Sequence, residues 1–488
     1  MNEIEFFLSK NQSENVKVNK INLHSNYNPQ VEAERYADNF TLPFKVLSIV
    51  ICEPALAYIL PFLKNKYPQL KIGCIRYTKE FSSYNKDFDF VINYYEHKEN
   101  FDEYLFNYFG EEDLLKTHFH FWDASSRAFL TETEATKKAV ISAIQKAKTL
   151  LVTREYFEKK WIINSINFLK YLNKTIKISG IDKDILILAS GPSLKALLKN
   201  LNEIKNHFFI ICLSSAISVL KYNKIEPDLY LSTDGGFWAG QHLKRIEKNI
   251  PLAISSEAYC PKKLISESVI LPLNYEDGTS SFLISGQNIS FTKAERNGTV
   301  SGTALDLALE IGSKDIYFAG LDLFSKADYS HANPNQIEIN SSIRENRIYS
   351  KEKHASSNLR GSYSLEVYRD WFSSKQTGSR KVYRIIDKKH NELGQIKDIS
   401  SKEFFNIFLS KKESSQNNIK KEKTDFSLNK EKLNKKVQDL FSDQSHLKEI
   451  FPLTYNSLFR NPDEKELLER LKDNKEKLYK RLIKIIND

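Results

Sequence analysis

Residues 184–195 read DILILASGPSLK, and this stretch decides the fold. A short unbroken apolar run is typical of a strand buried on both faces of a parallel sheet. The small polar residues Ser190, Gly191, Pro192 and Ser193 follow it directly. Because Pro192 suits the first turn of a helix, the segment predicts a strand, a tight turn and an amphipathic helix.

The same alternation of apolar runs and helical stretches continues to about residue 324. Strands that alternate with helices predict a parallel sheet, so we expect a Rossmann-like α/β domain over residues 184–408. Its expected strands are DILILA (184–189), FFIICL (208–213), LYLS (229–232), PLAIS (251–255), VILPL (269–273) and DIYFAG (315–320).

A second α/β domain is predicted upstream, over residues 1–130, with a helical connector at 131–183. No glycine cluster follows its first strand, so we expect a structural or partner-binding domain and no phosphate-binding loop. Its expected strands are VLSIVIC (46–52), KIGCIRY (71–77), DFVINYY (89–95) and HFHFWDA (118–124), with helices at 55–66, 101–108 and 132–172.

Three further segments follow the last strand of the central domain. Residues 325–365 are polar and lack periodicity, which is typical of an active-site lid. Residues 409–429 resemble a linker, and a C-terminal helical region is expected over 430–488. An apolar stripe at helical spacing marks that region: Leu467, Leu471, Leu478, Leu482 and Ile485.

Composition limits the class of protein. The chain has 488 residues, 41% hydrophobic and 27% charged, which excludes a wholly disordered chain. Its 72 basic and 62 acidic residues give a net charge of +10, which permits anionic partners without naming one. We predict no nucleic-acid partner.

Four cysteines without a C-x-x-C pair predict buried free thiols in a reducing compartment. The N-terminus lacks the pattern of a signal peptide. The most apolar window, residues 43–63, is interrupted by Lys45, Glu53, Pro54 and Pro61, so no membrane span is expected. These features predict a cytoplasmic protein.

Small polar residues follow successive strands of the central domain. Because ligands of open α/β sheets bind at the carboxyl ends of the strands, these residues form the candidate site. A second turn, NGTVSGT (297–303), leads into a helix and offers amide groups to an anion. The candidate residues are Ser190, Gly191, Pro192, Ser193, Ser214, Asp234, Gly235, Ser301, Gly302 and Thr303.

Neither turn is a dinucleotide fingerprint or a phosphate-binding P-loop. Each turn also has a purely structural explanation as a tight turn with a helix cap. Asp234 is equally open to two interpretations: an Asp turn before two glycines, or a ligand of Mg²⁺.

ILASGPSLK (187–195) together with SGTALDLALEIGSKDIYFAGLDL (301–323) resembles the central domain of the motility-associated factor (Maf) glycosyltransferases. The pair is also similar to small bacterial sialyltransferases and to a pterin diphosphokinase family. The resemblance implies a sialyltransferase-like fold and a CMP-activated nonulosonic acid (sialic, pseudaminic or legionaminic) as donor. It implies inverting transfer to Ser/Thr of flagellin, without metal or cofactor, in support of flagellar assembly and motility.

The resemblance also extends the candidate site. Asp322 stands in the glycine-acidic motif after the last strand, and His331 matches a polar-His-Ala step that follows that motif in Maf proteins. His331 and His354 are the candidate general bases, because imidazole titrates near neutral pH. Tyr329 is a candidate donor to the leaving phosphate.

Two other functions stay open. One is Mg²⁺-dependent diphosphokinase-like phosphoryl transfer to a small heterocycle. The other is a non-catalytic flagellin-binding scaffold, in which the strand-end turns would be structural only.

Overall fold

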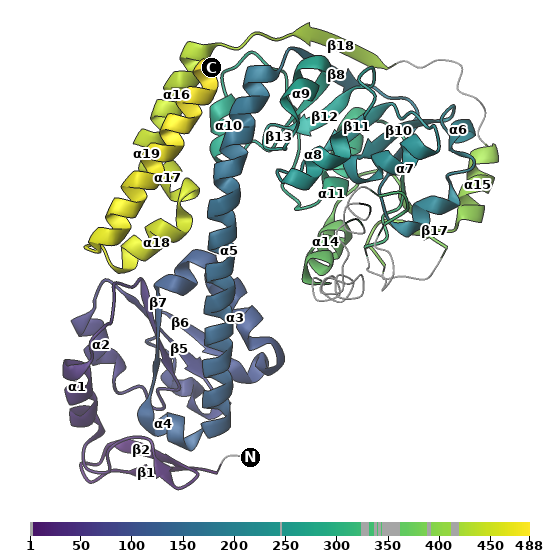
Figure 1. Cartoon of the computed structure of the whole chain (residues 1–488). Coiled ribbons are helices and arrows are strands. Elements are labelled where there is room, and N and C mark those ends of the chain that lie inside the picture. The colour runs from purple at the N-terminus through teal and green to yellow at the C-terminus, as the bar shows by residue number, and fades with distance from the viewer. Residues whose placement is uncertain are drawn as a thin grey trace. The chain divides into compact units, whose positions relative to one another are not determined.

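The computed structural model describes two compact units. They are Met1–Tyr156 with Leu447–Lys477, and Phe157–His446 with Leu478–Asp488; the long helix α5 (Leu130–Tyr171) contributes to both (Figure 1). The residues described are 3–244, 246–323, 331–335, 339, 343, 362–387, 392–410 and 419–488.

The second unit is built on one large sheet, and all six strands predicted for it are present. The strand order is β17-β16-β15-β9-β10-β11-β12-β13-β8-β18, with β14 paired to β13; every pairing is parallel except that of β18 with β8. The strands are β8 (Lys174–Ser179), β9 (Asp184–Leu188), β10 (Phe208–Leu213), β11 (Leu229–Ser232), β12 (Leu252–Ser255), β13 (Val269–Asn274), β14 (Thr292–Lys293), β15 (Ile316–Ala319), β16 (Val382–Ile385), β17 (Lys397–Ile399) and β18 (Lys420–Asp425).

The chain moves outward from β9 to β13 and then returns to place β15 on the other side of β9. The boundary between β9 and β15 is therefore the topological switch point, where α/β sheets bind ligands. Every residue of β9, β10, β11, β12 and β15 is buried, as the unbroken apolar runs predict.

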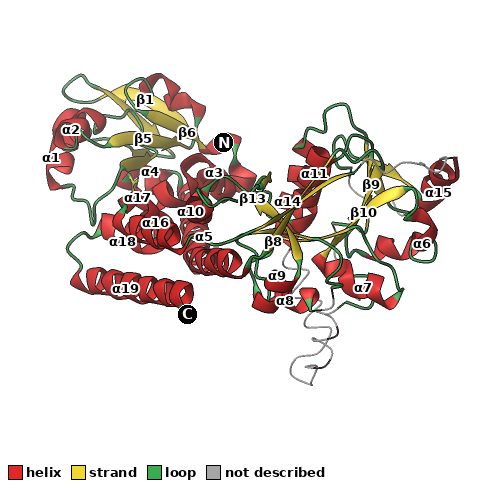
Figure 2. Ribbon diagram, turned by 90° about the horizontal axis from the view of Figure 1, so that it is seen from above, coloured by secondary structure: helices red, strands yellow, loops and turns green. Residues whose placement is uncertain are grey.

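Helices cover both faces of this sheet (Figure 2). Helix α11 (Val300–Ile311) lies on one face, where Leu305, Ala308 and Ile311 join the main hydrophobic cluster with alternate residues of the central strands. The other face carries α7 (Ile217–Tyr222), α8 (Phe237–Leu243) and α9 (Lys262–Glu267).

Two expectations for this unit are wrong in detail. The amphipathic helix expected after Pro192 is a 3-10 helix, η5 (Pro192–Ala196), and a short helix α6 (Leu201–Ile204). Successive i→i+3 bonds, such as Leu194 N to Gly191 O at 3.1 Å, produce the tighter winding while the leucines stay buried. The expected linker 409–429 contains β18, whose backbone pairs with β8 and needs no apolar side chains.

The first unit contains the four strands predicted for it, in one parallel sheet of order β6-β5-β4-β7. An antiparallel three-stranded sheet and the helix α1 were not predicted. The elements are β1 (Ile4–Leu8), β2 (Glu14–Val18), β3 (Ile21–Asn22), α1 (Pro29–Asn39), β4 (Ser48–Cys52), α2 (Leu60–Lys66), β5 (Lys71–Arg76), β6 (Phe90–Asn93), α3 (Phe101–Asp113), β7 (Thr117–Phe121) and α4 (Asp123–Ala128).

The C-terminal region is helical, as predicted. Leu478 and Leu482 of its apolar stripe are buried, while Leu467, Leu471 and Ile485 are half-buried. Its helices are α16 (Lys430–Ser442), α17 (Gln444–Ile450), α18 (Pro452–Arg460) and α19 (Lys465–Asn487).

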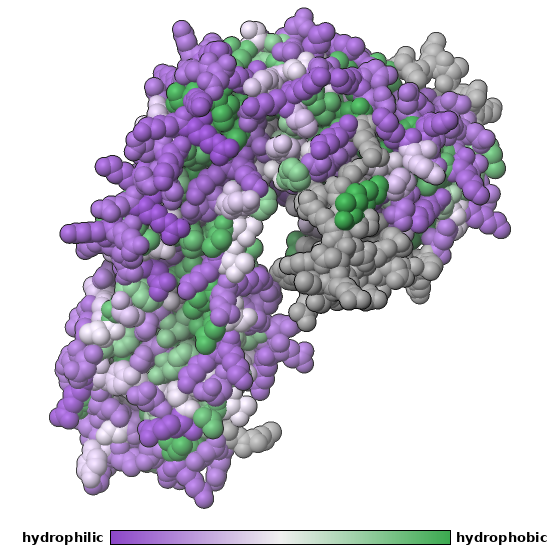
Figure 3. All heavy atoms as spheres, in the orientation of Figure 1, coloured by the Kyte–Doolittle hydropathy of each residue, from purple (hydrophilic) through white to green (hydrophobic). Residues whose placement is uncertain are grey.

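All four cysteines are buried free thiols, in agreement with their expected role. Within the described residues, no helix has both the length and the apolar composition that crossing a bilayer requires. The surface visible in Figure 3 is mostly hydrophilic and is interrupted by apolar residues on both units.

A buried ion pair closes the carboxyl end of β4. Glu53 and Arg76 are both fully buried, and Arg76 Nη1 donates to the Glu53 carboxylate at 2.8 Å. The same carboxylate accepts from Tyr77 N at 2.7 Å. Glu53, Ala55 and Ala57 adopt positive φ angles, so the helix expected from residue 55 begins only at Leu60.

We expect Arg76→Leu to lower the free energy of unfolding of the first unit by about 3–5 kcal/mol, because it leaves a buried carboxylate without its counter-charge. Hydrogen exchange of β4 and β5 amides in urea would measure the loss. Adding Glu53→Gln removes the charge but keeps an acceptor for Tyr77 N, so it should restore at least about 1 kcal/mol. Equal instability of the single and double variants would contradict this account.

Candidate functional site

Reciprocal hydrogen bonds join the turns that follow β9 and β15. Gly191 N donates to Gly320 O at 2.8 Å, and Gly320 N donates to Ser193 Oγ at 3.1 Å. Ser193 N donates to the Asp322 carboxylate at 2.9 Å. The two halves of the sequence signature, 129 residues apart between Ser193 and Asp322, thus meet at the switch point of the sheet.

This geometry changes the role expected of the first turn. As strand-end candidates, the amides of Gly191 and Ser193 are expected to be open to a phosphate, but both already have acceptors in the turn after β15. A Cβ on Gly191 would lie 2.3 Å from Asp322 Oδ2 and 2.5 Å from Gly320 O. Gly191 is therefore required for contact between the turns, and not for the approach of a ligand.

Asp322 holds the turns together with one carboxylate oxygen only. The other, Oδ1, is buried and has no hydrogen-bond partner among the described residues, and the side chain is 5% exposed. Buried carboxylate oxygens normally accept hydrogen bonds, so an unpaired one at a switch point can receive a donor from a ligand.

The first turn of α11 is shaped by Asn297. Its Oδ1 accepts from Thr299 N at 3.0 Å, and Thr299 in turn caps the helix by accepting from Ser301 N at 3.4 Å. A Cβ on Gly302 would lie 2.6 Å from the Asn297 amide, which explains the glycine. The Gly302 amide, in the first turn, has no acceptor within the helix and is the best placed of the predicted anion donors.

Asp234 and Gly235 follow β11, and their roles differ. Asp234 is exposed and accepts from Gly236 N at 2.8 Å, which makes the Asp turn that was one of its two interpretations. Gly235 is buried beneath α5, where a Cβ would lie 2.7 Å from the Trp161 indole. Gly235 therefore serves packing, whereas the exposed carboxylate of Asp234 stays available to a ligand.

A segment after β15 returns to the site and places His331. Ala332 N donates to Ser190 O at 2.6 Å, and Asn335, fully buried, donates its side-chain amide to Ser215 O at 3.2 Å. These bonds bring His331 next to the β9 turn. Tyr329, His354 and most of the predicted lid 325–365 lie outside the described residues.

His242 is a site residue that sequence analysis assigned incorrectly. Its neighbours Leu243 and Lys244 in the sequence favour a solvated helix face, yet His242 is 5% exposed and its Nδ1 has no partner among the described residues. Burial lowers the pKa of His242 to about 4, with a further contribution from the neighbouring His331. Its spacing from buried Ala239 was the signal that could have placed it on the inner face of α8.

Thr303, a predicted site residue, lies close to a tyrosine that sequence analysis missed. Burial raises the pKa of Tyr275, and the hydroxyls of Thr303, Thr233 and Ser255 partly offset that rise. Ser214 directly follows β10 and is buried. The next residue, Ser215, accepts the hydrogen bond from Asn335. The site thus combines hydroxyl groups, one carboxylate oxygen without a partner among the described residues and two histidines at one edge of the sheet, a set that can hydrogen-bond to a polar ligand.

Comparison with known proteins supports the fold. Residues 159–328 match the family model described as 6-hydroxymethylpterin diphosphokinase MptE-like. A Maf glycosyltransferase from Magnetospirillum magneticum AMB-1 aligns with 99% of this chain and 90% of its own, with a TM-score of 0.53 and 12% identity. An uncharacterized protein of Treponema pallidum is 29% identical over 314 residues, covering 64% of this chain and 69% of its own.

The chain is thus a mixed α/β protein with a parallel central sheet, and the predicted resemblance to Maf proteins and to the pterin diphosphokinase-like family is confirmed at the level of fold. At 12% identity the likeness to the Maf structure concerns architecture, so the reaction has to be argued from the site.

We expect Gly191→Ala to destabilise the second unit by about 1–3 kcal/mol, because the added methyl group overlaps fixed atoms of the β15 turn. Gly236→Ala is the matched control: the atoms nearest its Cβ would be those of the exposed Asp234 carboxylate, from 3.1 Å, and its φ of −88° suits alanine. The control should stay within about 0.5 kcal/mol of the wild type in chemical unfolding. Equal effects would refute the close approach of the two turns.

Stability of the second unit should fall as the pH is lowered from about 6.5 to 4. His242 stays neutral in the folded state down to about pH 4, while the unfolded chain binds a proton near pH 6.5. The unfolded state therefore holds one more proton in this window. His242→Met cannot titrate and should lose less stability between pH 7 and 4.5, as measured by urea unfolding; an identical loss in both proteins would show that His242 is not buried neutral.

Proposed function

We propose that this chain is a glycosyltransferase that moves a nonulosonic acid from a CMP-activated donor onto Ser/Thr of flagellin. The fold shared with the Maf glycosyltransferase of Magnetospirillum magneticum supports the class of enzyme. The nonulosonic acid, the CMP donor, the flagellin acceptor and a cytoplasmic location are proposals that rest on the sequence resemblance.

The observation that carries the proposal is the docking of the His331 segment onto the β9 turn. The 2.6 Å bond from Ala332 N to Ser190 O fixes the residue next to His331 at the switch point. A histidine held there can accept the proton of an acceptor hydroxyl. The hydroxyl oxygen then attacks the anomeric carbon, the bond from that carbon to the phosphate oxygen breaks, and CMP leaves with inversion.

The other residues take supporting roles in this proposal. The Gly302 amide at the start of α11 would donate to the nucleotide phosphate, and the Asp322 Oδ1 atom would accept from a ribose or base group. Ser214 and Asp234, at neighbouring strand ends, are placed for ribose contacts. Tyr329 and His354 stay candidates of the sequence, as donor to the phosphate and as the rival base.

The match of residues 159–328 to the MptE-like model favours a second candidate, diphosphoryl transfer to a small heterocycle. In that reaction the heterocycle's hydroxyl attacks the β-phosphorus of ATP and AMP is released. Asp234, exposed at the end of β11, would then hold Mg²⁺. Calorimetry separates the candidates: CMP binding without Mg²⁺ supports the first, and Mg²⁺-dependent ATP binding supports the second. A scaffold would bind neither.

We expect His331→Ala to lose about 10²–10⁴-fold in turnover and to keep its affinity for CMP, since a general base contributes to the transition state and little to nucleotide binding. Intact-mass spectrometry of flagellin incubated with enzyme and CMP-nonulosonic acid would measure transfer. His354→Ala serves as the comparison variant. If His354→Ala is inactive while His331→Ala transfers normally, the base is His354.

A further inference from the structure

The outer edge of β7 is an unpaired strand edge in the first unit. β7 ends the sheet order β6-β5-β4-β7, and its inner side pairs in parallel with β4. Directly before the two strands, Leu47 N donates to Lys116 O at 2.8 Å. Because backbone groups alternate along a strand, the N–H and C=O groups of Phe119 and Phe121 point away from β4. Within the described part of the chain, these groups have no hydrogen-bond partner.

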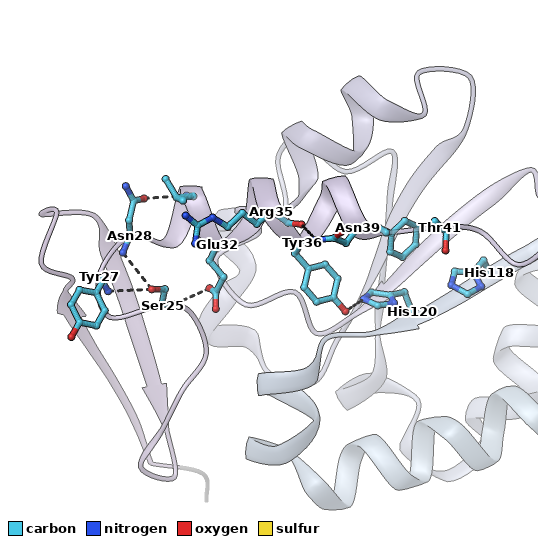
Figure 4. Close-up of a pocket in the computed structure, with 12 residues that line it drawn as sticks. Ser25, Tyr27, Asn28, Glu32, Arg35, Tyr36, Asn39, Thr41, His118 and His120 are labelled. Carbon is cyan, nitrogen blue, oxygen red and sulfur yellow. Dashed lines mark hydrogen bonds between the residues drawn. The ribbon is translucent and has the colours of Figure 1, made fainter.

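A polar cavity of about 800 Å³ borders one face of this edge. Figure 4 shows Tyr36 and Asn39 on α1 and the imidazoles of His118 and His120 on β7 around it, with Tyr36 Oη 3.0 Å from His120 Nε2. Burial lowers the pKa of His118, and lowers that of His120 to about 4, so both are neutral at pH 7. Glu32 and Arg35 also line this cavity and have opposite charges, so it suits polar side chains without a net charge.

An apolar cavity of about 420 Å³ borders the other face. Its walls include Phe119, Phe121, Ile141 and Ile144, and Ile141 on α5 is 56% exposed. His118 lines both cavities, so they meet at the strand. An unpaired edge flanked by one polar and one apolar cavity is the arrangement that accepts an added strand, whose side chains alternate between the two faces.

The charges of the apolar cavity select its occupant. Lys137, Lys148 and Arg460 line it and no carboxylate does. The Arg460 guanidinium lies 3.7 Å from the centroid of the Phe44 ring, and its Nε is buried with no acceptor among the described residues. Lys137 already pairs with Glu134 at 3.1 Å, so an acidic side chain at one end of the added strand would pair with Lys148 and Arg460.

The large sheet of the second unit shows how a strand edge is protected. β18 is the edge strand KKEKTD, and all six of its residues are exposed and mostly charged, a pattern that discourages pairing. β7 has the sequence THFHF, with no residue charged at neutral pH. The contrast indicates that the edge of β7 is kept open.

We propose that the β7 edge binds an extended segment of a partner protein by strand addition. The segment carries apolar side chains at alternate positions, polar uncharged ones between them and an acidic residue at one end. This interaction is independent of the proposed transfer reaction, and its failure would leave that reaction untouched.

The test uses the full-length protein and a fluorescein-labelled peptide of alternating valine and threonine with aspartate at each end. We expect saturable binding in fluorescence anisotropy and slower hydrogen exchange of the Phe119 and Phe121 amides. Two further peptides are each N-methylated at one of the two alternating sets of amides. Only one set of amides faces β7, so only the peptide methylated at that set should lose binding. Equal binding of both methylated peptides would overturn the proposal, as would no binding at all.

Two substitutions on the same helix provide the matched variants. Ile141→Lys places a charge in the apolar cavity and should weaken binding at least about tenfold. Val152→Lys, 52% exposed on α5 and outside both cavities, should leave affinity unchanged. Equal effects of the two substitutions on affinity would overturn the proposal. Light scattering that shows a dimer of the wild type, dissociated by Ile141→Lys, would also overturn it, because the occupant of the edge would then be a second copy of this chain.

Discussion

The contact between the turns after β9 and β15 is the constraint on which the central site depends. The strands from β9 to β13 are added on one side of β9, and β15 is added on its other side. These two turns are therefore neighbours in space although they are far apart in sequence. Ser193 contributes both a donor and an acceptor to the contact, and Gly191 and Gly320 give the backbones room to approach. The small residues of the motif are therefore explained by packing between strand ends.

That contact also determines what remains for a ligand. Amides that bond across the switch point are not available to a ligand. The groups left unpaired at this edge are the amides in the first turn of α11 and the Oδ1 atom of Asp322. His331 reaches the same edge because its neighbour Ala332 is bonded to Ser190. The site is built from groups that the packing of the strand ends leaves unpaired.

The two units use the same type of sheet in different ways. In the first unit, the carboxyl end of β4 is filled by the Glu53–Arg76 ion pair and by His24, whose Nε2 accepts from Leu56 N at 3.1 Å. Buried side chains fill this strand end, and no glycine follows the strand. The cavities of this unit lie instead along the edge of its sheet, on the two faces of β7.

The sequence by itself determined the strands, because an unbroken apolar run of five or six residues specifies burial on both faces wherever it occurs. It also placed Asp322 and His331 near the first turn, through a motif. The tertiary structure alone decided that the Gly191 and Ser193 amides are engaged, that His242 is buried beside His331, and that Asn335 anchors the returning segment. Those outcomes depend on which strands become neighbours, and local sequence carries no information about contacts made across the sheet.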